Sequence, residues 1–374
     1  MTNESMELGN LKWRHPLGDV RRIPERCVWA ITDLCNCDCI HCETHSSVPH
    51  VAELSLVQMQ SVADQLGALG CQHVSLTGGE PLLSPHWEGL SKHLKRLGLR
   101  VHLVTNGTLI DGAMLERLIS SGVDGLKISI DGLRHTHNRT RVSLHAFPGS
   151  AFDSSIDGIK CARGLLPVDV ITQINQDNID ELTTLGELLN SLGVARWILQ
   201  LAIPSGRVQS LGRPYVLAPR QLPALADFIV GARNGERYPA IEVTDTIGYC
   251  SKQEMEIRSR AIPMMWLGCN AGVRLVSISC SGTVSGCSGL PPEFDAGSLH
   301  DETLAAIWNE ADRFSYVTKF DSNLLTGGCA RCALGKICRA GCPILSYHTT
   351  GTIYENRHCL RLLEDVLNQG DDKL

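Results

Sequence analysis

Residues 35–42 read CNCDCIHC, and this stretch decides how the rest of the 374-residue chain is interpreted. Cys35, Cys39 and Cys42 follow one another at short spacing, so that a single loop supplies three thiolates. Four thiolates would complete a zinc site or the ligand set of a [4Fe–4S] cluster, whereas three leave one metal position for another ligand. The stretch therefore predicts a metal or cluster site.

The whole chain contains 16 cysteines, and its N-terminus, MTNESMELGN, lacks the basic-then-apolar order of a signal peptide. Because thiols stay reduced in the cytoplasm, we expect a cytoplasmic protein whose cysteines bind metal rather than form disulfides. No apolar run approaches the about 18 residues of a membrane span. The net charge of −6 provides no global positive field for nucleic acid, and 43% hydrophobic residues exclude a disordered chain. We expect neither membrane nor nucleic acid as a partner.

Outside the cysteine groups, short β-branched runs alternate with amphipathic helical patterns. The predicted strands are Val28–Thr32, His73–Thr77, Val101–Thr105, Leu126–Ile130, Val168–Ile174 and Trp197–Ile203. The predicted helices are Leu56–Leu69, His86–Leu97, Ala113–Ser121, Phe152–Arg163 and Ile179–Leu192. This alternation indicates an α/β fold with a parallel sheet. Six units fall short of a complete eight-strand barrel of ~250 residues, so we expect a partial (β/α)6 TIM-type barrel.

Polar motifs follow four of the predicted strands. They are the cysteine loop, Gly78-Gly79-Glu80-Pro81, Thr105-Asn106-Gly107 and Ser129-Ile130-Asp131-Gly132. In parallel β/α folds the active site forms at the carboxyl ends of the strands. We therefore expect these motifs to meet on one rim.

The cysteine spacing, the GGEP motif and the six β/α units together resemble radical S-adenosylmethionine (SAM) enzymes. The resemblance implies that Cys35, Cys39 and Cys42 hold a [4Fe–4S] cluster whose remaining iron binds SAM. One electron, from a donor of the flavodoxin or ferredoxin type, would then cleave SAM to a 5'-deoxyadenosyl radical that abstracts a substrate hydrogen. In such enzymes the cofactors supply the chemistry and the protein positions them.

The resemblance also assigns SAM contacts, one residue at a time. Gly78, Gly79 and Glu80 resemble the motif that binds the methionine amine, in which glycines allow close backbone approach. Ser129 and Asp131 occupy ribose-contacting positions, Arg141 resembles the arginine that pairs with the SAM carboxylate, and His41 takes the place of an aromatic residue near adenine. From the residues alone, Ser129 and Asp131 also fit a turn with a helix cap. Arg141 equally fits a solvated surface charge.

A second cysteine group occupies the C-terminal third of the chain. Two strand runs, Val273–Ser279 and Thr283–Ser285, flank Ser281-Gly282 and predict a hairpin. From spacing alone, Cys329, Cys332, Cys338 and Cys342 could form one zinc site. The full seven-cysteine order, however, resembles the SPASM domain, which carries two auxiliary [4Fe–4S] clusters.

By that resemblance, Cys269, Cys287 and Cys342 bind the auxiliary cluster nearer the active site. The outer cluster has four ligands, Cys329, Cys332, Cys338 and Cys359. With the SAM-binding cluster, this makes three [4Fe–4S] clusters. The inner one has three assigned ligands, and either Cys280 or an open position completes it. Cys250 is a candidate hydrogen donor to a substrate radical, or else a small buried residue.

The predicted domains are an N-terminal segment (1–26), the partial barrel (27–235), a bridging segment (236–268) and the SPASM domain (269–374). The leading hypothesis is that the enzyme modifies a ribosomally made peptide by crosslinking, thioether formation, epimerisation or oxidation. A separate recognition protein could present that peptide. The alternatives are a dehydrogenase or epimerase of a small natural product, such as a sugar or aminocyclitol, and a zinc-binding scaffold without catalysis.

Overall fold

The computed structural model describes residues 22–44, 46, 52–144, 149–258 and 266–369. Most of the predicted N-terminal segment, 1–26, lies outside the described residues. None of the helices within the described ranges is long and apolar enough to cross a membrane.

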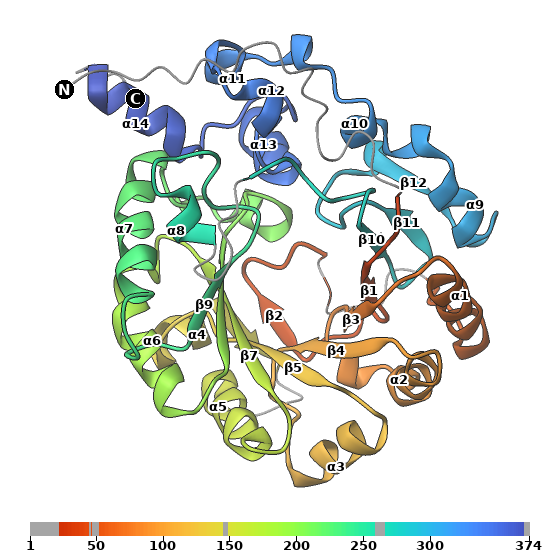
Figure 1. Ribbon diagram of the computed structural model, residues 1–374. Helices are drawn as coiled ribbons and strands as arrows, with labels where there is room; N and C mark the ends of the chain where they lie inside the picture. The colour runs from red at the N-terminus through yellow and green to blue at the C-terminus, as the bar shows by residue number, and fades with distance from the viewer. Residues whose placement is uncertain (1–21, 45, 47–51, 145–148, 259–265, 370–374) are drawn as a thin grey trace.

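Ten strands form one curved, open sheet, which Figure 1 shows as an arc. Their order across the sheet is β12-β11-β10-β1-β3-β4-β5-β7-β8-β9. The strands are β1 (Arg26–Ala30), β3 (His73–Thr77), β4 (Arg100–Thr105), β5 (Gly125–Ser129), β7 (Val168–Ile174), β8 (Arg196–Leu201), β9 (Ala240–Val243), β10 (Leu275–Ile278), β11 (Thr283–Ser285) and β12 (Asp295–Ser298). A separate two-stranded sheet joins β2 (Cys37–Cys39) to β6 (Arg141–Ser143).

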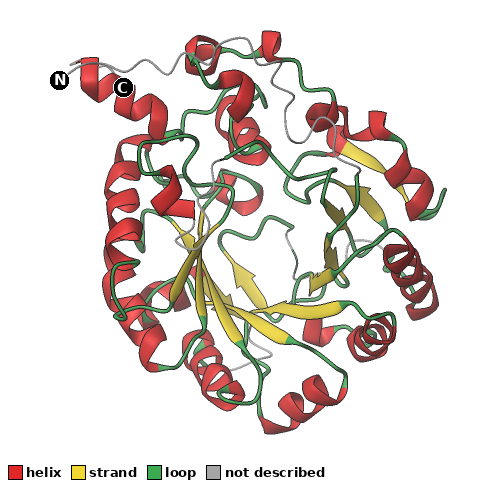
Figure 2. Ribbon diagram, viewed as in Figure 1, coloured by secondary structure: helices red, strands yellow, loops and turns green. Residues whose placement is uncertain are grey.

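Helices follow the strands and cover the outside of the arc, as Figure 2 shows in red. In the barrel they are α1 (Leu56–Ala68), α2 (Trp87–Arg96), α3 (Gly112–Ser120), α4 (Arg134–Thr140), α5 (Ala151–Ala162), α6 (Leu182–Ser191), α7 (Leu222–Ala232) and α8 (Glu254–Arg258). The C-terminal helices span the open side of the arc (Figure 1) and are α9 (Leu304–Asn309), α10 (Ser315–Thr318), α11 (Gly327–Arg331), α12 (Gly335–Cys338), α13 (Pro343–Thr350) and α14 (Leu360–Gln369).

The six predicted strands are confirmed as β1, β3, β4, β5, β7 and β8, with ends shifted by at most two residues. Trp29, Leu76, Leu103 and Leu126 are register partners across four neighbouring strands, and all four are fully buried. Buried and partly exposed residues alternate along β1, β3 and β4, so the aligned residues lie on one buried face of the sheet. This register aligns the carboxyl ends of the strands, so the polar motifs that follow them share one rim.

Four strands outside the six predicted β/α units, β9 to β12, extend the sheet. β9, from the predicted bridging segment, pairs in parallel with β8. The predicted hairpin is confirmed as β10 and β11, and β10 also pairs in parallel with β1, on the far side of β1 from β3. The cysteine-rich C-terminal region is therefore hydrogen-bonded into the sheet of the barrel.

Candidate active site

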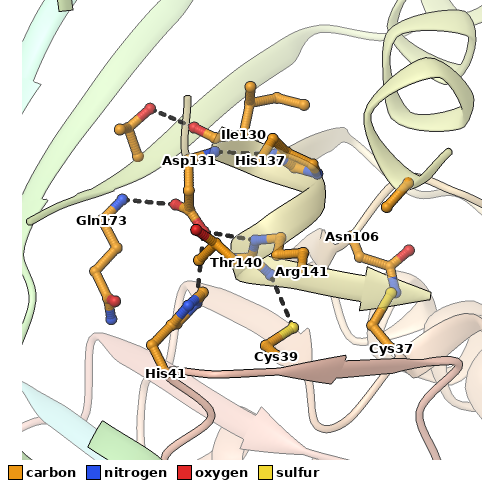
Figure 3. Close-up of polar contacts among 12 residues, drawn as sticks. Cys37, Cys39, His41, Asn106, Ile130, Asp131, His137, Thr140, Arg141 and Gln173 are labelled. Carbon is orange, nitrogen blue, oxygen red and sulfur yellow. Dashed lines mark hydrogen bonds and ion pairs between the residues drawn. The ribbon is translucent and has the colours of Figure 1, made fainter. Parts of the chain in front are cut away.

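The cysteine loop leaves β1 and places Cys35, Cys39 and Cys42 at the rim. Its middle forms strand β2, which pairs with β6 so that Cys39 lies opposite Arg141. The Arg141 Nη1 donates to the Cys39 sulfur at 3.9 Å (Figure 3). The backbone N–H of Cys42 donates to the Cys39 carbonyl at 3.2 Å, which closes the turn between these two thiols.

The surroundings act in opposite directions on two thiols of this loop. Burial raises the pKa of Cys35 to about 12. Cys37, which had no predicted role, donates its thiol hydrogen to Cys39 and lowers the pKa of Cys39 to about 7. Cysteine binds metal as the thiolate, so the residues fit a cluster whose positive iron would stabilise the deprotonated sulfurs.

Gly78 and Gly79 bring the end of β3 against the backbone that enters the cysteine loop. A Cβ on Gly78 would lie 2.3 Å from the Thr32 carbonyl oxygen, and one on Gly79 would lie 2.2 Å from the Leu34 carbonyl oxygen. The Gly79 N–H donates to Thr32 O at 2.8 Å, and the Glu80 N–H donates to Leu34 O at 2.7 Å. Only glycine allows this approach, which fixes the cysteine loop to its neighbouring strand.

The Glu80 side chain is fully buried beneath this junction. It accepts hydrogen bonds from the Thr105 hydroxyl (2.8 Å), the Asn106 N–H (2.8 Å) and the Leu82 N–H (3.2 Å). Burial raises its pKa to about 7, although these donors favour the carboxylate. The Asn106 side chain in turn donates to Asn36 Oδ1 at 2.7 Å, so Glu80 and Asn106 connect β4 to the cysteine loop.

A buried charged group connects the end of β5 with the cysteine loop (Figure 3). Arg141 Nε lies 2.6 Å from Asp131 Oδ2, and His41 Nε2 lies 3.4 Å from the same oxygen. Gln173 donates its backbone N–H to Asp131 Oδ1 at 2.8 Å. Burial alone would raise the pKa of Asp131, but Arg141 and the histidines lower it overall. Arg141, whose side chain is 15% exposed, is thus an ion-pair partner of the buried Asp131 and not a solvated surface charge.

His41 is buried and stacks on Tyr215, with ring centroids 6.3 Å apart and planes 9° from parallel. Burial lowers the pKa of His41 to about 4, so its ring is neutral at pH 7. Ser129 is buried at the last position of β5. Sequence reasoning missed Tyr215, because no spacing relates it to His41, which lies 174 positions away.

The inner auxiliary group brings together Cys269, Cys287 and Cys342, whose thiols act electrostatically on one another. Burial, together with the Glu43 and Asp245 carboxylates, raises the pKa of Cys287 to about 11. Glu43 directly follows Cys42 in sequence. The group therefore lies next to the cysteine loop.

Asp245 is the second residue that sequence reasoning did not assign. Its side chain is 49% exposed, yet desolvation by the surrounding protein raises its pKa. Asp245 also acts electrostatically on Cys269 and Cys342, so its carboxylate lies near all three thiols of the inner group.

The outer auxiliary group surrounds a cavity lined by Cys329, Cys332, Cys338 and Cys359. These are the four cysteines that the resemblance assigns to one cluster. Within the part of the chain that the structure describes, no three His, Cys, Asp or Glu side chains converge closely enough to hold a single metal ion. The four cysteines instead line a shared space, which suits a multi-iron cluster.

The sequence left two alternatives open for Cys250 and two for the ligand at Cys280. Cys250 lies in the outer cavity, where it contacts Cys338, because a left-handed turn at Tyr249 and Cys250 directs its thiol there. Cys250 is 4% exposed, which agrees with the alternative of a small buried residue. Cys280 donates to the Asp33 carboxylate, with Glu53 nearby, so it does not complete the inner group in this arrangement.

Comparison with known proteins matches two parts of the chain. Residues 29–189 match the radical SAM superfamily, and residues 269–333 match SPASM, an iron–sulfur cluster-binding domain. The chain therefore contains a radical SAM domain and a SPASM domain. These matches confirm the predicted fold class, and they imply that the protein uses SAM and iron–sulfur clusters.

Proteins similar to this chain are named for different activities. An AdoMet-dependent heme synthase of Methanosarcina barkeri is 28% identical and covers 90% of this chain and 96% of its own length. The mycofactocin maturase MftC of Mycobacterium ulcerans is 25% identical, over 86% of this chain and 83% of its own. The crystal structure of Streptococcus suis SuiB bound to S-adenosylmethionine shares the fold, with a TM-score of 0.70 at 15% identity over 91% of this chain and 77% of that chain.

Proposed function

We propose that this radical SAM/SPASM enzyme modifies a ribosomally made peptide, with Cys35, Cys39 and Cys42 as ligands of the SAM-binding [4Fe–4S] cluster. When bound, that cluster and SAM supply a 5'-deoxyadenosyl radical that abstracts a substrate hydrogen. A flavodoxin or ferredoxin provides the electron. Two auxiliary [4Fe–4S] clusters, at the inner and outer cysteine groups, complete a set of three.

The chain's own residues position SAM at the rim. Gly78, Gly79 and Glu80 hold the methionine amine, and the ammonium charge lowers the Glu80 pKa from its raised value. Arg141 has five N–H donors and uses one on Asp131 and one on Cys39, so its guanidinium can also bind the SAM carboxylate. His41, as a neutral ring beside Tyr215, packs near adenine, and Ser129 and Asp131 contact the ribose.

The observation that favours a peptide is the negative charge between the barrel rim and the inner cysteine group. Glu43 and Asp245 act on Cys287, and Asp33 and Glu53 act on Cys280. A carboxylate-rich substrate would be repelled there, whereas a peptide brings backbone N–H donors or basic side chains that carboxylates bind. The similarity to the maturase MftC also supports this class of substrate.

A second candidate function is the conversion of an iron tetrapyrrole. It is favoured by the 28% identity with a heme synthase, which extends over nearly the full length of both chains. The propionate groups of such a substrate would need basic partners. The carboxylates at Cys287 and Cys280 argue against it, and we rank it second.

The test compares the two substrate classes in parallel reactions. The reconstituted, reduced enzyme is incubated anaerobically with SAM in deuterated water, and with either a short peptide encoded beside its gene or Fe-coproporphyrin III. We expect 5'-deoxyadenosine to rise only with the peptide, whose mass rises by about 1 unit on epimerisation or falls by about 2 on oxidation or crosslinking. A mass change in the porphyrin alone would establish the second function.

The assignment of the SAM site has its own control. The triple variant Cys35→Ala/Cys39→Ala/Cys42→Ala is expected to form no 5'-deoxyadenosine and to lose about four of about twelve irons. The remaining irons would belong to the auxiliary groups. Undiminished 5'-deoxyadenosine formation would show that these three thiols do not bind the cluster that cleaves SAM.

A further inference from the structure

Five cysteines, not four, line the outer cavity. Cys250 joins Cys329, Cys332, Cys338 and Cys359, although it comes from a different part of the chain. A [4Fe–4S] cluster has four irons and takes four thiolates. The cavity therefore offers one sulfur more than the cluster needs.

The surplus sulfur is paired with one particular ligand. The Cys338 thiol donates a hydrogen bond to Cys250, so the two sulfurs are in contact. Cys250 is 4% exposed and is oriented by a weak hydrogen bond, 3.7 Å from its sulfur to the Trp266 carbonyl oxygen. The Trp266 ring N–H donates to the Cys338 carbonyl at 2.8 Å, so one tryptophan holds both cysteines in place.

The backbone on both sides of this pair adopts unusual conformations. Tyr249 and Cys250 have φ values of 81° and 58°, and Arg339 and Ala340, directly after Cys338, have values of 55° and 57°. These are the only non-glycine residues with positive φ among those the structure describes. Residues other than glycine adopt this conformation at an energetic cost, and it persists where surrounding contacts require it. Here the two left-handed turns bring Cys250 and Cys338 together.

We propose that Cys250 is an alternate ligand of the outer auxiliary cluster, able to bind the iron that Cys338 binds. In the exchange, the bond from iron to the Cys338 sulfur breaks and a bond to the Cys250 sulfur forms. The Cys250 thiol loses its proton on binding, the released Cys338 sulfur takes up a proton, and no electron is transferred. The inference rests on the proposed second auxiliary cluster.

The test counts irons in single and double variants after anaerobic reconstitution, with electron paramagnetic resonance spectra of the reduced proteins. Cys250→Ala and Cys338→Ala are each expected to keep the wild-type iron content, whereas the double variant loses about four irons. Cys329→Ala, which has no spare sulfur paired with it, is expected to lose about four irons alone. In Cys338→Ala the outer cluster's spectrum should shift, because a different cysteine binds one iron.

The outcomes separate this inference from the proposed function. If Cys338→Ala loses as much iron as the double variant, Cys250 is not an alternate ligand. If Cys329→Ala loses no iron, the outer cluster itself is absent and the proposed set of three clusters fails.

A second measurement does not depend on the folding of Cys338→Ala. Iron release from the intact protein to a chelator should be several-fold faster in Cys250→Ala than in the wild type, because no second sulfur recaptures the iron. Cys161→Ala, which removes a half-buried cysteine on α5, should release iron at the wild-type rate. Equal rates in Cys250→Ala and the wild type would overturn the proposal.

Discussion

At the scale of single residues, the candidate active site depends on a backbone contact that leaves no room for a side chain. The Cβ of a Gly79→Ala variant would lie 2.2 Å from the Leu34 carbonyl oxygen, and this neighbour is backbone that cannot rotate away. We expect the variant to lose at least about 1–3 kcal/mol of unfolding free energy, as overpacked sites do. The loss is measured by anaerobic urea denaturation, together with iron content.

Gly112→Ala is the matched control. Gly112 begins α3, and no atom lies within 4 Å of the position its Cβ would take. Alanine is also the better helix former, so this variant should be as stable as the wild type or about 0.5–1 kcal/mol more stable. Equal stability of the two variants would show that the Gly79–Leu34 contact is not tight.

His137 gives the site a measurable response to pH. It is fully buried, accepts the Asp131 N–H at Nδ1 (3.2 Å), and burial lowers its pKa to about 3. Between pH 6.5 and 4 the unfolded chain protonates this histidine and the folded protein does not, so stability falls as the pH falls. His137 should contribute a slope of up to about 1.4 kcal/mol per pH unit in that window.

The test is His137→Asn, in which the Asn Oδ1 can still accept the Asp131 N–H. The unfolding free energies of wild type and variant are measured at pH 7 and at pH 5, and the difference between the two proteins is compared. His41 and Glu80 are present in both proteins, so their contributions cancel in that difference. The variant should lose less stability on acidification. A constant difference across the two pH values would mean that His137 is protonated in the folded state.

At the scale of elements, the segment after β8 clamps the cysteine loop. In the 3-10 helix Gly206–Ser210, the Arg207 N–H donates to Cys42 O at 3.1 Å, and its Nη1 donates to Cys39 O at 3.0 Å and pairs with Asp38. Arg207→Ala removes the side-chain contacts and is expected to lower the hydrogen-exchange protection of amides 36–43 about tenfold, or ~1.4 kcal/mol.

The control for this prediction is Arg237→Ala, which removes an exposed pair with Glu187 on the outside of the barrel. Exposed ion pairs contribute about 0–1 kcal/mol, so protection of the cysteine loop should not change. If Arg207→Ala also leaves that protection unchanged, the backbone contacts alone hold the loop.

The elements of the barrel were predictable because each depends on local pattern. Apolar runs gave the six strands, and helical periodicity gave α1, which begins in the structure with a capping box of Ser55 and Gln58. Strand β9 was missed because its four residues are too short to show a period. The pairing of β10 with β1 was missed because nothing local relates strands so distant in the chain.

The site was predictable where a motif carries the chemistry, as in Cys35, Cys39 and Cys42. It was not predictable where residues meet through the fold. The contact of Glu80 with Asn106 and the position of Asp245 beside Cys287 depend on which strands are neighbours. Cys250 had a plausible role from its place in sequence, but its left-handed backbone directs it to the outer cavity instead.

At the scale of the whole molecule, the barrel and the SPASM domain share one sheet. β1 lies between β3 of the barrel and β10 of the C-terminal region, and Val276 and Ile278 of β10 are buried. Removing residues 269–374 would therefore expose a hydrogen-bonding edge of β1 and the apolar core beside it. Exposed edges of this kind aggregate, so the barrel is not expected to fold alone.

The same shared sheet predicts that both domains unfold together. We expect pulsed hydrogen exchange in urea to give one midpoint for peptides from β3–β5 and from α9–α13. Ile278→Ala, which creates a cavity at the junction, should lower both midpoints together and cost about 2–5 kcal/mol. Ile119→Ala, on the exposed face of α3, should change stability by no more than about 0.5 kcal/mol. Two separate midpoints, or an Ile278→Ala effect confined to the C-terminal peptides, would show that β10 is only docked on the barrel. A strand that is integral to one sheet lowers the stability of the elements on both of its sides when it is destabilised.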